Sequence, residues 1–139
     1  MKARMIVLFG AVAALAACGP PTFKATLSGG AEVPALTGIA GTGSVTVTVD
    51  GMNVDVTGTY SGLTGAAQSA HLHGPGTAAE TKPNVCTLTV TEGTPAGSGT
   101  LAGECLAFDI AGLNSGMYYA NIHTTAHAGG EIRGQLAKQ

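Results

Sequence analysis

Apolar and polar residues alternate at every second position from Phe23 onward, which is the pattern of β-strands with one buried face. The clearest case is GSVTVTVDGMNVDVTGTY, residues 43–60. A two-residue turn at Asp50-Gly51 predicts a hairpin whose facing pairs are Val49–Met52, Val47–Val54 and Val45–Val56. All apolar side chains of this hairpin then share a core-facing side, and the water-facing side carries Thr46, Thr48, Asn53 and Asp55.

The same alternation predicts one strand in FKATLSG, residues 23–29, and five more after the hairpin. Clusters of Gly, Pro, Asn and Ser bound these five, at residues 68–73, 85–91, 98–108, 117–124 and 131–136. About eight short strands without an amphipathic helix imply an antiparallel sandwich or a Greek-key barrel. The longest expected loop is GPGTAAETK, residues 74–82.

Residues 1–17 do not follow this pattern. Lys2 and Arg4 precede the apolar run MIVLFGAVAAL, which is typical of a secretory signal peptide and too short to span a bilayer. The segment LAAC that ends at Cys18 resembles the lipobox of bacterial lipoproteins, so cleavage would leave Cys18 as a lipid-modified N-terminus. We therefore predict a signal peptide at 1–17, a lipidated Cys18 with a short tether at 18–22, and one domain over 23–137.

Gly19 stands where such lipoproteins carry an aspartate for retention in the inner membrane. The expected location is therefore the outer membrane of a bacterial cell envelope, with the domain facing the periplasm or the exterior. Removing 17 of the 139 residues leaves 122, enough for one hydrophobic core. Four basic side chains then oppose eight carboxylates, a net charge of −4 with no basic run, which argues against nucleic-acid binding.

The three cysteines divide into one lipid-bearing residue and one pair. A hairpin folded about Pro95 would place Cys86 opposite Cys105, and in an exported protein that pair should be oxidised to a disulfide. The alternative, two free thiols that bind a metal, is less favoured because they lie far in sequence from the histidines and match no short ligand motif.

The four histidines fall into two clusters, each beside a glycine-rich loop. SAHLHGPG holds His71 and His73, which project from one face of a strand about 7 Å apart. NIHTTAHAGGEIRG holds His123 and His127. Neutral imidazoles suit Cu(II) or Zn(II) better than Ca²⁺ or Mg²⁺, which prefer oxygen. The alternative is that these are half-exposed histidines that bond loop carbonyls and bind no metal.

Three motifs in order, FKATLSGGAEVP, SAHLHGPG and YYANIHTTAHAGGEIRGQL, resemble the CHRD domain over nearly the whole expected mature chain. The resemblance implies an antiparallel Greek-key β-sandwich of about eight strands, similar in fold to Cu/Zn superoxide dismutase. By that analogy His71 and His73 are two copper ligands and His123 is a third, with possible help from His127. The loop at 74–82 lacks the histidines of the dismutase zinc site, so a dinuclear centre is not expected.

The resemblance and the residues together favour a membrane-anchored domain that binds one copper ion, or zinc, for metal handling at the envelope. No catalytic residues are predicted, and superoxide dismutase-like activity of a mononuclear copper site is a subordinate hypothesis. Arg133 is expected to be structural and to pair with Glu131, Glu104 or Asp109. The alternative function is a metal-free adhesion or protein-interaction scaffold, whose partner would be another envelope protein.

Overall fold

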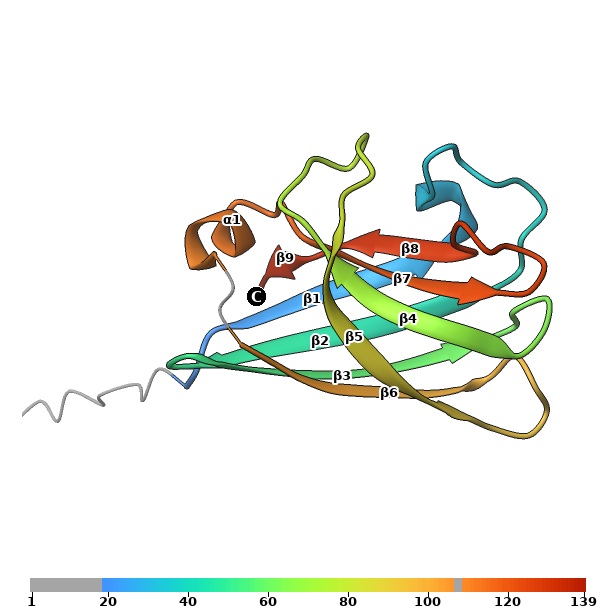
Figure 1. The fold of residues 1–139 in the computed structure, drawn as a ribbon, viewed down its shortest axis with the longest axis horizontal. Coiled ribbons are helices and arrows are strands. Elements are labelled where there is room, and N and C mark those ends of the chain that lie inside the picture. The colour runs from blue at the N-terminus through green and yellow to red at the C-terminus, as the bar shows by residue number, and fades with distance from the viewer. Residues whose placement is uncertain (1–18, 107–108) are drawn as a thin grey trace, which may run out of the picture.

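The structure, a computed structural model, describes residues 19–106 and 109–139 (Figure 1). The predicted signal peptide and Cys18 lie outside the described residues. The described strands are β1 (Thr22–Ser28), β2 (Thr42–Asp50), β3 (Asn53–Ser61), β4 (Ala67–His73), β5 (Asn84–Glu92), β6 (Gly99–Leu106), β7 (Tyr119–Thr124), β8 (Ile132–Gln135) and β9 (Ala137–Lys138). The helices are one 3-10 turn, η1 (Gly29–Ala31), and a short α1 (Ile110–Asn114).

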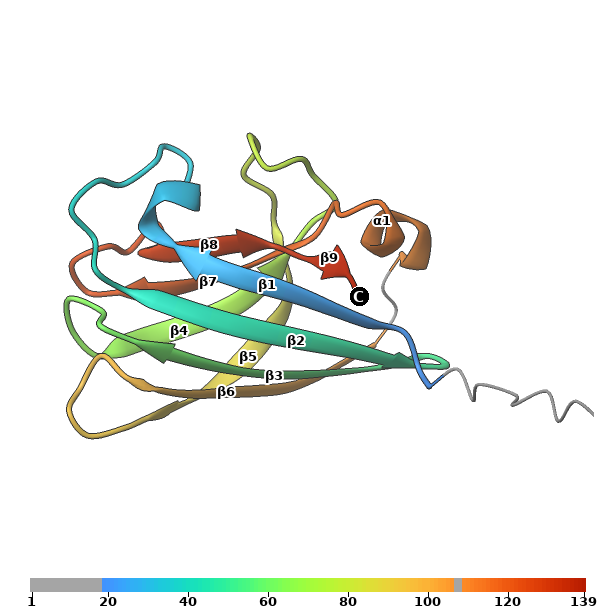
Figure 2. The same ribbon diagram turned by 180° about the vertical axis from the view of Figure 1, so that it is seen from behind.

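These strands form one closed barrel. Hydrogen-bonded neighbours follow the order β2-β3-β6-β5-β4-β7-β8-β1-β9, and a further pairing of β1 with β2 joins the two sides of the sheet. All these pairings are antiparallel, as expected. The expected two-sheet sandwich is wrong, because strands β1 to β8 make one continuous hydrogen-bonded wall (Figures 1 and 2). Period-two alternation marks an inner and an outer face, and it does so equally in a sandwich and in a barrel.

The core fills the inside of this barrel. The fully buried large side chains include Phe23, Leu27, Leu72, Ile122, Ile132 and Leu136, together with the valines of the first hairpin. Burying each such side chain contributes about 1.5–3 kcal/mol relative to leaving it in water. Hydrophobic burial inside a closed wall leaves the outer surface available for polar groups.

The first hairpin has the predicted faces but a different register. Its turn is Gly51-Met52, with Gly51 in the left-handed region at a φ of 61°, and Asp50 pairs with Asn53. Val49 therefore faces Val54 rather than Met52, and Met52 is 76% exposed at the tip. A shift of two residues keeps every side chain on its side of the sheet, so the alternation could not detect it.

The predicted disulfide between Cys86 and Cys105 is present, with the two Cα atoms 5.9 Å apart. β5 divides its pairing: its first part bonds β4, where Cys86 faces Leu72, and its last part bonds β6, from Thr89 onward. The disulfide thus joins β5 to β6 beyond the point where their hydrogen-bonded ladder ends. The expected strand at 98–108 is β6, and the last two of those residues lie outside the described part of the chain.

Short α1 was not expected from the sequence. Its N-cap is Asp109, whose carboxylate accepts a hydrogen bond from the backbone N–H of Ala111. Over residues 19–106 and 109–139, no helix has the length and apolar character needed to cross a membrane.

The outer face of β4, β7 and β8 is partly covered by the loop between β4 and β5 (Figure 1). Gln135 on β8 donates to the backbone oxygen of Gly76, and the Tyr119 hydroxyl accepts from the backbone N–H of Lys82. Polar side chains of the barrel wall therefore hold this loop in place.

Candidate metal centre

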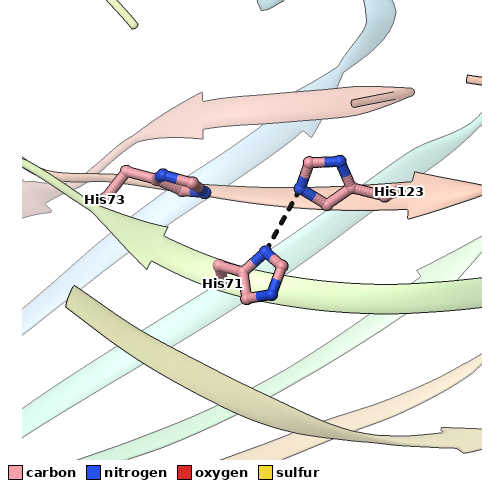
Figure 3. Close-up of side chains that lie close together, drawn as sticks. All are labelled: His71, His73 and His123. Carbon is pink, nitrogen blue, oxygen red and sulfur yellow. Dashed lines mark hydrogen bonds between the residues drawn. The ribbon is translucent and has the colours of Figure 1, made fainter. Parts of the chain in front are cut away.

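Strands β4 and β7 lie side by side and carry three of the four histidines on the outer wall. In their register Ser69 faces His123, and His71 faces Asn121. Because side chains alternate along a strand, His71 and His73 point outward while Leu72 between them is buried in the core. His71, His73 and His123 each offer a ring nitrogen, and these three atoms all lie within 4.8 Å of one another (Figure 3).

Nδ1 of His71 and Nε2 of His123 are 3.2 Å apart and share a hydrogen bond, the dashed line in Figure 3. In a tetrahedral site with metal–nitrogen bonds of 2.0–2.1 Å, two ligand nitrogens are separated by about 3.3 Å. This pair therefore already has the spacing of neighbouring ligands of one ion, and His73 stands beside it.

Backbone carbonyls fix the orientation of two of these rings. Nδ1 of His73 lies 2.8 Å from the oxygen of Lys82, and Nδ1 of His123 lies 2.9 Å from the oxygen of Ala128. A carbonyl oxygen only accepts, so each Nδ1 carries the proton and each Nε2 keeps its lone pair. This is the arrangement usual for metal-binding histidines, in which the outer nitrogen donates to a fixed acceptor.

Nε2 of His73 has one further neighbour, the side-chain amide of Asn121 at 3.0 Å. The amide oxygen faces Nε2, while the amide NH₂ group hydrogen-bonds the Glu32 carboxyl. With Nδ1–H donated to Lys82, Nε2 and this oxygen face each other as two acceptors, so the amide does not use the lone pair of His73.

Burial keeps two of the rings neutral. Desolvation lowers the pKa of His71, and the nearby His123 and His73 lower it further. Desolvation also lowers the pKa of His73, against the opposing effect of its hydrogen bonds to Lys82 and Asn121. Neutral imidazoles have the lone pairs that a metal ion needs.

Aromatic and cationic side chains support the His73 ring. The ring stacks on Tyr119 with the centroids 4.9 Å apart and the planes 4° from parallel. Arg133, only 2% exposed, lies over the same tyrosine and donates to the backbone oxygens of Glu80 at 2.8 Å and Thr77 at 3.5 Å. Arg133 is therefore buried and packed against these groups, and its backbone partners differ from the carboxylates Glu131, Glu104 or Asp109 predicted for it.

Glu32 is a buried acid that the sequence analysis did not single out. It is 8% exposed, and its Oε1 has no hydrogen-bond partner. Desolvation raises its pKa to about 7, although Arg133, the backbone of Val33 and the Asn121 side chain act in the opposite direction. A side chain at Gly130 would place its Cβ 2.6 Å from Glu32 Oε1, so the carboxyl packs directly against this glycine. In the sequence, Glu32 lies in the segment GGAEVP, and nothing in that segment indicates that its carboxyl group is buried.

His127 is not brought into the histidine cluster. It lies in the loop between β7 and β8, where its backbone exchanges hydrogen bonds with Thr124 and its carbonyl accepts from Gly130. Among the described residues, the group able to hold an ion consists of His71, His73 and His123. Of the four histidines predicted as metal ligands, the structure brings three together and leaves His127 apart from them.

Comparison with known proteins agrees with the three sequence motifs. Searches of curated proteins and of solved structures each found no match, so the likeness to the dismutase fold stays a prediction. The family model of the CHRD domain matches residues 23–136, which covers the barrel from β1 to β8 and all three clustered histidines. The chain therefore belongs to the CHRD domain family.

Proposed function

We propose that this CHRD domain binds a single copper ion, or alternatively zinc, through His71, His73 and His123 while a lipid on Cys18 anchors it in the cell envelope. One observation carries the metal site: three ring nitrogens lie within 4.8 Å, and two of their rings donate Nδ1–H to backbone carbonyls. Metal handling at the envelope, rather than catalysis, is the proposed role.

The donor set favours a borderline ion. Three neutral nitrogens and no carboxylate make up the cluster, which suits Cu(II) first and Zn(II) second in the usual order of affinities. His127 would join only if residues 125–130 rearranged, so the geometry supports three protein ligands. Three ligands would leave one position for water or for a receiving group on a partner, and redox reaction with superoxide is the subordinate possibility.

The test is a Cu(II) titration of the soluble domain from Gly19 to Gln139, followed by calorimetry and by electron paramagnetic resonance. We expect one ion per chain and at least a tenfold weaker affinity for His71→Ala, His73→Ala and His123→Ala. His127→Ala is the matched control and should bind as the wild type does. Circular dichroism checks that each variant keeps its β-structure.

Unchanged affinity in all three variants would disprove the histidine site. In that case the alternative proposal, a metal-free adhesion or interaction scaffold, becomes the leading one. Changes in the exposed part of the β4–β5 loop should then alter binding to an envelope partner, without any effect of copper.

A further inference from the structure

The two most exposed large apolar side chains lie together at one end of the barrel. Among the described residues, the large hydrophobic side chains that are exposed are Met52, Val85, Leu106 and Ile110. Met52 at the β2–β3 tip is 76% exposed and Leu106 at the end of β6 is 73% exposed. Asn53 on β3 pairs with Leu106 on β6, so Met52, one residue earlier in the turn, lies near Leu106.

Val85 does not belong to this group. It follows Asn84, which pairs with His73, so it lies beside the candidate metal centre on the wall of the barrel. We refer to Met52 and Leu106 as the apolar end.

The N-terminal chain enters the barrel at this end. The backbone oxygen of Pro21 accepts a hydrogen bond of 3.0 Å from the N–H of Val49, one residue before β2 ends at Asp50. Figures 1 and 2 show the start of β1 beside that turn. Cys18 precedes Pro21 by three residues, a span of about 10 Å even when fully extended.

We propose that the apolar end rests on the surface of the lipid bilayer in which Cys18 is anchored. This inference depends on the lipid anchor of the proposed function, and it is independent of the metal site. A tether of about 10 Å cannot carry the domain away from the headgroups, and it leaves the barrel at the end where the exposed apolar side chains lie. Those side chains would enter the headgroup region, where apolar surface leaves water.

The negative charges near the apolar end determine which lipid headgroups it can approach. Three exposed carboxylates, Asp50, Asp55 and Glu104, lie around the groove that Leu106 also lines. Anionic headgroups would repel them, whereas zwitterionic headgroups would not. The bilayer surface that fits is therefore one rich in zwitterionic lipid.

This orientation leaves the histidines accessible. They lie on β4 and β7 in the wall of the barrel (Figure 3), and Figure 1 shows these strands apart from the β2–β3 turn that carries Met52. The domain would stand on the membrane with its candidate metal centre at the side, open to the aqueous phase.

The experiment uses the full-length lipidated protein in phosphatidylcholine vesicles whose acyl chains carry a nitroxide quencher. A fluorophore is attached through Met52→Cys, and in a second sample through Ala96→Cys in the β5–β6 turn. β6 runs eight residues between the two ends, about 25 Å, so Ala96 marks the far end. We expect at least threefold stronger quenching at position 52 than at position 96.

Two further variants test which side chains make the contact. Adding Leu106→Asp to the Met52→Cys protein should reduce the quenching at least twofold, while Thr100→Asp, an exposed site further along β6, should not. Replacing a third of the phosphatidylcholine by phosphatidylglycerol should also reduce it. Mass spectrometry of Cys18 and vesicle flotation verify the anchor in every sample.

Equal quenching at positions 52 and 96 in a lipidated, vesicle-bound protein would overturn the orientation while the anchor stands. If quenching at position 52 falls as more protein is bound to the same amount of lipid, a second copy of the protein covers the apolar end. That result would also overturn the proposed orientation. If mass spectrometry shows that the expressed full-length protein carries no lipid on Cys18 and it does not float with the vesicles, both the anchor and the orientation are disproved. Copper titration of the same samples reports the metal site separately.

Discussion

The guanidinium carbon of Arg133 lies 3.4 Å from the centre of the Tyr119 ring, and the His73 ring stacks on that same tyrosine. Through this stack and its bonds to the β4–β5 loop, one buried arginine supports both the candidate ligand His73 and the loop whose Lys82 carbonyl orients it. The loop and the ligand are therefore parts of one packed unit.

Arg133→Met should destabilise the domain by about 2–4 kcal/mol, because it leaves the Glu80 and Thr77 carbonyls without their charged donor. The stability of Arg133→Lys should lie between that of the wild type and that of Arg133→Met, since lysine keeps the charge but not the planar group that stacks on Tyr119. Urea denaturation measures both, and exposed Lys24→Met is a control expected to change stability by less than about 0.5 kcal/mol. Equal stability of Arg133→Met and the wild type would contradict this role.

His73 and His123 should both be Nδ1–H tautomers in the metal-free protein at pH 8, because each Nδ1 faces a backbone carbonyl. Long-range proton–nitrogen correlation spectra distinguish the two neutral tautomers directly. Finding the Nε2–H tautomer at either residue would remove the preset orientation on which the metal proposal depends.

Replacing Cys86 and Cys105 together by alanine should lower the free energy of unfolding by about 3 kcal/mol in the loop-entropy account, given a sequence separation of 19. A reducing agent should lower the stability of the wild type by a similar amount and leave the double variant unchanged. Sensitivity of the double variant to the reductant would show that the loss has another cause.

Glu32 should make stability depend on pH. Its folded pKa of about 7 lies above its ordinary value of 4.5, so between these values the folded state keeps a proton that the unfolded chain has lost. The stabilising contribution is complete below pH 4.5 and is lost as pH rises toward 7, by up to about 3 kcal/mol.

Comparing Glu32→Gln with the wild type by urea denaturation at pH 5 and pH 8 isolates this effect. The comparison is needed because His71 and His73, whose folded pKa values are lowered, give the opposite slope below pH 6.5. We expect Glu32→Gln to gain stability relative to the wild type at pH 8 more than at pH 5. A pH-independent difference would contradict the assignment.

Local patterns predicted the strands well but not how they are joined. Alternation placed Val45, Val47, Val54 and Val56 on the correct face, yet it gave the wrong register, because only the turn at Gly51-Met52 sets it. Closure of the barrel depends on β1 pairing with both β2 and β8, contacts between distant segments that a period of two does not encode.

The candidate site shows the same division. His71 and His73 could be placed on one face from their spacing alone, but the place of His123 beside them came from family resemblance. His127, four residues further on, was included because a sequence does not show where a loop turns. The buried Glu32 and the carbonyl of Lys82 escaped notice, since backbone acceptors and burial on an outer wall leave no periodic signal.

The closed barrel has a consequence for when an ion could be acquired. In small zinc domains the ion organises the core, so losing it means unfolding. Here the hydrophobic interior closes without any of the three histidines, which lie on its outside. Folding and metal loading would therefore be separate events, and the domain could be delivered empty, take up an ion in place and give it up again with its shape unchanged.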